Sequence, residues 1–88
     1  MLGINSSNFA TIFGKVLRKA RKDAGFSQEQ LGFEADLQRN YISLMELGRY
    51  QPTVGTLFKL AYALKLKPNE LVSLIENALL EQAESIEK

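Results

Sequence analysis

The chain of 88 residues is long enough for one small domain with a single hydrophobic core. Its composition is that of an ordinary globular protein, with 45% hydrophobic and 24% charged residues. The absence of cysteine and histidine excludes a disulfide framework, a thiolate nucleophile and the commonest metal ligand and general base. We therefore expect no catalysis, no metal and no cofactor. No apolar run reaches the ~18 residues that cross a bilayer, and no signal peptide is evident, so we expect no membrane partner and a cytoplasmic location.

The charges are unevenly distributed along the chain, although the formal net charge is only +1. Residues 1–22 contain five basic residues and no acid, whereas residues 76–88 contain four acids and one base. This asymmetry suits a protein that presents one basic face to nucleic acid. Solvated helix faces of no particular function would explain the charges equally well.

A first helix is predicted by apolar residues that recur with helical spacing between Phe9 and Ala20. Gly25 ends this helix. Three neighbouring residues are suitable N-caps, and the pattern does not choose among them: Ser6, Ser7 and Asn8.

A second helix begins after Ser27, which forms a capping box with Gln30. Asp36 ends it, because aspartate tolerates the left-handed backbone conformation better than most residues. Gly32 lies inside this helix, where glycine costs about 1 kcal/mol relative to alanine. Close approach of the next helix would explain it, and a merely tolerated glycine is an equal alternative.

A third helix is expected from Arg39 to Leu47, with Gly48 as its C-terminal cap. Ile42 and Met45 point inward at 3.6 residues per turn. The opposite side is unusual for a surface helix, because polar side chains that can read bases occur there beside leucines: Arg39, Asn40, Ser43, Leu44 and Leu47.

Two further helices complete an all-α, five-helix domain that spans residues 1–88. Thr53 caps the fourth helix, whose core stripe ends near Leu64. The fifth helix runs from Pro68 to about Glu84. It has more apolar residues than one packing face needs, and such an excess marks a surface for association.

The segment from Ser27 to Gly48 resembles the helix-turn-helix of the phage-repressor and Cro family. The motif occupies about residues 27–47, and the likeness covers residues 9–72. The run Arg39-Asn40-Tyr41-Ile42-Ser43 further resembles the controller proteins of restriction–modification systems, in which R-x-Y-I-S opens the recognition helix. Two residues depart from the family pattern, namely Asp36, where glycine is commonest, and Gln38, where serine or threonine is usual.

The resemblance implies that the third helix enters the DNA major groove with its N-terminal residues at base edges. Arginine suits guanine, asparagine suits adenine, serine suits either, and an apolar group suits the thymine methyl. For Leu44, an exposed leucine without a role is an equal alternative. The predicted base contacts are Arg39, Asn40, Ser43 and Leu44.

Phosphate contacts are expected around this helix. Gln28 opens the preceding helix, where backbone N–H groups and the helix dipole favour an anion. Tyr41 either contacts phosphate through its hydroxyl or packs against its neighbours. An ordinary surface role is the alternative for each predicted phosphate contact: Gln28, Tyr41, Arg49, Tyr50, Gln51 and Lys22.

The resemblance also implies a buried structural ion pair between Arg21 and Glu46. It predicts a homodimer that binds double-stranded DNA at a near-palindromic operator and regulates transcription. RNA polymerase is a further candidate partner for which the sequence offers no dedicated surface. The alternative is an antitoxin or another protein-interaction module with the same fold. The expected dimer contacts are Tyr62, Val72, Ile75 and Leu79.

Overall fold

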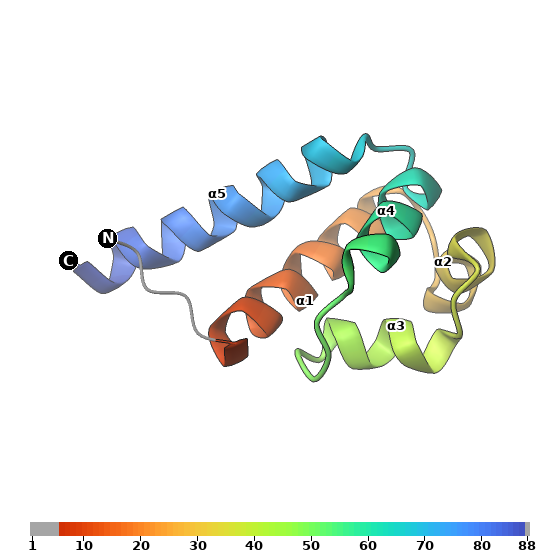
Figure 1. The fold of residues 1–88 in the computed structure, drawn as a ribbon, viewed down its shortest axis with the longest axis horizontal. Coiled ribbons are helices and arrows are strands. Elements are labelled where there is room, and N and C mark those ends of the chain that lie inside the picture. Colours follow the sequence, from red (N-terminus) through yellow and green to blue (C-terminus); the bar gives the residue numbers. More distant parts are fainter. Residues whose placement is uncertain (1–5, 88) are drawn as a thin grey trace.

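A computed structural model describes residues 6–87 of the chain, and the side chains of residues 8–83 (Figure 1). All regular structure in this part of the chain is helical, which confirms the all-α prediction. α5 extends three residues beyond its predicted end, and α3 ends one residue before its predicted end. The helices are α1 (Ser6–Asp23), α2 (Gln28–Ala35), α3 (Arg39–Glu46), α4 (Val54–Ala63) and α5 (Pro68–Glu87).

The first helix is the centre of the bundle. α1 packs against α3 on one side and α5 on another, so it lies between them in Figure 1. α2 packs against both α3 and α4, and α4 packs against α5. The two helices of the motif therefore pack on α1 and α4, which in turn pack against α5.

A single core holds these helices together, as the length of the chain predicts. Every helix contributes at least one side chain with no exposed surface, and α3 contributes two of them. Burial of apolar surface is the main favourable contribution to folding in a domain of this size. The fully buried large side chains are Phe13, Leu17, Leu31, Ile42, Met45, Leu60 and Leu71.

The two ends of α2 and its internal glycine have the structure that the sequence predicts. The Ser27 hydroxyl accepts the Gln30 backbone N–H at 3.0 Å, and the Gln30 side chain accepts the Ser27 N–H at 2.8 Å, which completes the capping box. Asp36 adopts the left-handed conformation with φ +57°. A Cβ at Gly32 would lie 2.7 Å from the carbonyl oxygen of Leu37, so close approach of the chain accounts for this glycine.

The third helix is fixed at its C-terminal end. Gly48 adopts φ +78°, as expected for a C-terminal cap, and no side chain caps the N-terminus at Gln38. α1 crosses this end at Gly14, where an added Cβ would lie 2.5 Å from the carbonyl oxygen of Met45. Only glycine permits so close an approach of two helix backbones.

One predicted surface residue lies in the core instead. Ile75 is only 5% exposed and packs with Leu60 and Leu71, so its expected place at a dimer surface is wrong. The period of α5 turns Ile75 towards the same side as Leu71, four residues earlier. The excess apolar surface of α5 is therefore carried by other residues.

Candidate nucleic-acid interface

The outer side of α3 has the composition that the sequence predicted. Arg39 and Asn40 are exposed, whereas Ser43 and Leu44 are half-buried. The opposite side of the same helix is anchored by side chains with no exposed surface, namely Ile42 and Met45. α3 thus presents a polar edge to solvent while its apolar edge lies in the core.

The predicted ion pair is present and buried. The Arg21 Nε donates to Glu46 Oε2 at 2.6 Å, and Nη2 donates to Glu46 Oε1 at 2.9 Å. The two side chains are only 10% and 4% exposed. Hydrogen bonding to Glu46 raises the pKa of Arg21 above its ordinary value. The pair ties the end of α3 to α1.

Gln28, the predicted phosphate contact at the start of α2, is half-buried and joined to this pair. Its amide Nε2 donates to Glu46 Oε1 at 3.2 Å. Neither residue type nor spacing signals this bond, because the two residues are eighteen positions apart on different helices. The first turn of α2 and the last turn of α3 are therefore linked through side chains.

The loop after α3 carries the other predicted backbone contacts. Arg49, Tyr50 and Gln51 are all exposed. The ring of Tyr50 packs against that of half-buried Tyr41, with centroids 6.0 Å apart and planes tilted by 55°. Packing therefore accounts for part of the Tyr41 side chain, and this ring pair holds the loop next to α3.

Lys22 lies apart from this group, on the exposed side of α1. It lines a shallow surface hollow together with Lys15, Arg18 and Lys19. The structure thus places these basic side chains together, but Asp23 lines the same hollow and pairs with Lys19 at 2.8 Å. It does not bring Lys22 into the cluster around α3.

The outer face of α2 carries a feature that the sequence analysis missed. Phe33 is 85% exposed, the largest exposed fraction among the large apolar side chains of the described residues. Glu29, Gln30 and Glu34 surround it and line the same hollow. The available signal was that Phe33 lies two residues from both Leu31 and Ala35, and thus on the opposite side of the helix from the buried residues.

Exposed apolar side chains also occur on α4 and on α5, two helices that pack together. Phe58 and Tyr62 form an edge-to-face pair with centroids 6.2 Å apart. Val72 is 46% exposed, and Leu79 is half-buried at the edge of the core. Apart from Ile75, the predicted dimer residues therefore do reach the surface. We call Phe58, Tyr62, Val72 and Leu79 the α4–α5 face.

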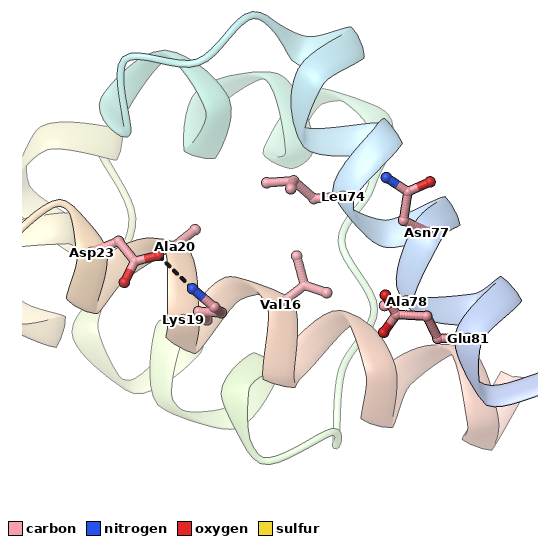
Figure 2. A pocket seen from close by; sticks show the side chains of 8 residues that line it. All are labelled: Val16, Lys19, Ala20, Asp23, Leu74, Asn77, Ala78 and Glu81. Atoms are coloured by element: carbon pink, nitrogen blue, oxygen red, sulfur yellow. Dashed lines mark hydrogen bonds and ion pairs between the residues drawn. The ribbon is translucent and has the colours of Figure 1, made fainter. Parts of the chain in front are cut away.

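A groove beside α5 lies on its other side, against α1 (Figure 2). It has a volume of about 340 Å³ and a mainly apolar lining that includes Val16, Ala20, Leu74 and Ala78. At its rim the Lys19 Nζ donates to Asp23 at 2.8 Å. No cluster of three acidic, histidine or cysteine side chains that could hold a metal occurs within the described residues.

The chain belongs to the helix-turn-helix family, whose model matches residues 17–71. Its relatives include restriction–modification controllers. It is 35% identical to the control protein C.BamHI of Bacillus amyloliquefaciens over 68 residues, which cover 76% of this chain and 84% of that protein. This result confirms the resemblance that the motif residues indicated.

Solved structures agree. The controller C.AhdI of Aeromonas hydrophila is 39% identical, with a TM-score of 0.68 over 70% of this chain and 94% of the other. The controller C.Esp1396I, solved as a tetramer with its 35-base-pair operator, has a TM-score of 0.75 at 24% identity over 82% and 95% of the two chains, and this likeness supports the fold alone. Among the described residues, no helix is both long and apolar enough to cross a membrane.

Proposed function

We propose that this protein is a sequence-specific DNA-binding regulator of transcription, of the restriction–modification controller type. It binds a near-palindromic operator as a homodimer, in the cytoplasm and without catalytic activity. The observation that carries the proposal is the division of α3 into two sides. Arg39 and Asn40 are exposed and Ser43 is half-buried, while Ile42 and Met45 are fully buried. Such a helix can enter a major groove without disturbing the core.

Base reading falls to the outer side of α3. A bidentate Arg39–guanine pair supplies roughly 1–3 kcal/mol of discrimination against other bases. Asn40 is suited to adenine, and Ser43 accepts either partner. Leu44 is half-buried, so its exposed part is limited to an apolar contact such as a thymine methyl. Within α3 the acidic residue Glu46 has a buried side chain, so its carboxylate does not compete for the bases.

Backbone contacts flank this helix on both sides. Gln28 lies at the N-terminus of α2, where the helix dipole attracts phosphate. Arg49, Tyr50 and Gln51 follow α3 and extend the same surface, with Tyr41 behind them. Lys22 contributes a more distant positive charge. These contacts fix the position of the reader and carry most of the salt dependence.

The α4–α5 face is the proposed dimer surface. Two readers related by a two-fold axis would contact half-sites roughly 34–36 Å apart, one turn of duplex. Replacing Val72 by Asp places a charge in this face, so we expect sedimentation to give monomers. Leu74 is exposed to a similar extent on the same helix but lines the groove on its other side, against α1, so Leu74→Asp is the matched control. A Val72→Asp protein that stays dimeric would move the interface elsewhere.

Selection of duplexes from a random pool tests the function directly. We expect enrichment of two inverted half-sites one helical turn apart, bound more weakly as salt increases. No enrichment, together with co-purification of a second small protein, would instead favour the antitoxin or protein-interaction alternative.

The outer face of α2 supports RNA polymerase as a further partner. The acids Glu29 and Glu34 would be repelled by the DNA phosphates. Together with exposed Phe33 they suit a protein surface with an apolar pocket and a basic rim. We expect Phe33→Ser to preserve operator binding and to change the output of a purified transcription system. Unchanged output would remove this face from the proposal.

A further inference from the structure

The buried carboxylate of Glu46 accepts more hydrogen bonds than an ion pair alone requires. The Arg21 guanidinium already binds both of its oxygens, at 2.6 and 2.9 Å. A third bond reaches Glu46 Oε1 from the Gln28 amide at 3.2 Å. The extra donor comes from the residue that opens α2, at the edge of the proposed DNA surface.

The carboxylate is itself held rigidly. Arg21 Nη1 donates to the carbonyl oxygen of Phe26 at 2.9 Å, so the guanidinium is fixed to the α1–α2 loop as well as to α3. Glu46 is 4% exposed and lies in the last turn of a helix that is anchored in the core. Its Oε1 is therefore a fixed point relative to the first turn of α2.

The bond to this fixed point orients the amide of Gln28. It uses one of the two hydrogens on Nε2 and leaves the second hydrogen for another acceptor. Gln28 is half-buried, so part of this residue is accessible at the surface beside the first turn of α2. At that surface the N-terminus of α2 favours an anion.

We propose that Glu46 is a positioning residue for DNA binding, which holds the Gln28 amide ready to donate to a backbone phosphate. The inference rests on the proposed function, because it assigns the partner of Gln28 as DNA phosphate. Its physical content is preorganisation: a side chain already fixed in the unbound protein loses little rotamer freedom on binding. The ion pair would then contribute to affinity in addition to stability.

The test must separate positioning from folding, because removing one member of a buried pair leaves an unpaired charge. Replacing both members by apolar residues of similar volume, as in Arg21→Met with Glu46→Leu, is often neutral for stability. This double variant keeps the core filled and removes the acceptor for Gln28. Its fold and unfolding temperature are checked before any DNA measurement.

The proposal is then tested by a double-mutant cycle, in which the affinity for the selected operator is measured for Gln28→Ala in two backgrounds. Gln28→Ala in the wild-type chain should weaken binding about two- to tenfold, the range expected for one immobilised side chain. The same change in the Arg21→Met, Glu46→Leu background should have almost no effect, and base preference should be unchanged in all variants. An equal loss in both backgrounds would overturn the positioning role while leaving the regulator intact. A wild-type chain that selects no duplex would instead contradict the proposed function.

If the double variant does not fold, a second measurement on the wild-type chain tests the same proposal. Side-chain amide hydrogen exchange of the wild-type chain compares Gln28 with Gln30, whose capping bond uses the amide oxygen, whereas the bond of Gln28 to Glu46 uses the amide nitrogen. The Gln28 amide should exchange more slowly than the Gln30 amide. Equal rates would show that Glu46 does not hold Gln28 and would overturn the proposal.

Discussion

The two helices of the motif have the same length and are stabilised in opposite ways. α2 and α3 each contain eight residues. α2 is closed at its N-terminus by the reciprocal bonds of Ser27 and Gln30, which depend only on neighbouring residues. α3 has no side-chain cap at Gln38, and its other end is held by α1 through Gly14 and by the Arg21–Glu46 pair.

The two ends of α3 therefore have different roles: the N-terminal end is the proposed reader of DNA, and the C-terminal end is fixed to the rest of the protein. An uncapped N-terminus leaves backbone N–H groups available to a ligand, and Arg39 and Asn40 occupy the same turn. Tertiary contacts at the C-terminus supply the rigidity that local capping does not. Changes at the tertiary anchor should therefore cost more stability than changes at the local cap.

The largest effect is expected from the ion pair. Glu46→Ala leaves the Arg21 charge buried without a partner, which should lower the free energy of unfolding by about 3–5 kcal/mol. Urea denaturation measures this change. Glu34→Ala removes an exposed acid on α2 and should have little effect, so similar losses in the two variants would contradict the anchoring role.

The next effect concerns the crossing of α1 and α3. Gly14→Ala places a Cβ 2.5 Å from the backbone oxygen of Met45, and overpacking of this kind costs about 1–3 kcal/mol. Gly55→Ala is the matched control in α4, because its Cβ would meet nothing closer than 3.9 Å. Thermal unfolding should show a loss for Gly14→Ala and a gain of about 0.5 kcal/mol for Gly55→Ala. Equal shifts would rule out a backbone clash.

A smaller loss is expected at the local cap of α2. Ser27→Ala removes the acceptor for the Gln30 N–H and should cost about 1 kcal/mol. The change is measured as a shift of the urea midpoint at an unchanged slope. Ser73→Ala on the exposed side of α5 is the control. An equal loss of stability in this variant would show that removing any exposed serine hydroxyl, and not loss of the cap, causes the effect.

The smallest effect sharpens the comparison by adding a cap to α3. Gln38 already has the extended backbone of an N-cap, with φ −71° and ψ 143°, but its side chain makes no capping bond. Gln38→Ser should therefore raise the free energy of unfolding by about 0.5 kcal/mol. A decrease in the same urea experiment would mean that Gln38 is required for another reason.

Much of this arrangement was predictable because it depends on neighbours in the sequence. The Ser27 capping box, the left-handed Asp36 and the inward side of α3 all follow from local pattern and were correct. The Arg21–Glu46 pair was also predicted, but through the family resemblance, since no local signal joins residues 25 positions apart.

The features that the sequence did not predict depend on packing between distant segments. Ile75 was placed at a dimer surface because α5 is apolar on several sides, and only the packing of α4 and α1 decides which side is buried. The bond from Gln28 to Glu46 and the exposure of Phe33 have the same origin. Periodicity identifies a buried side most reliably when a helix has only one apolar stripe.

The most direct test of base reading by α3 is to repeat the duplex selection with Arg39→Ala and Arg49→Ala side by side. We predict that Arg39→Ala loses its preference at one base pair in each half-site. Arg49→Ala should keep the base preference at every position and bind all duplexes more weakly. The slope of the logarithm of its binding constant against the logarithm of the salt concentration should become smaller by about one. An Arg39→Ala protein that selects the same operator as the wild-type chain would contradict the assignment of α3 as the reader.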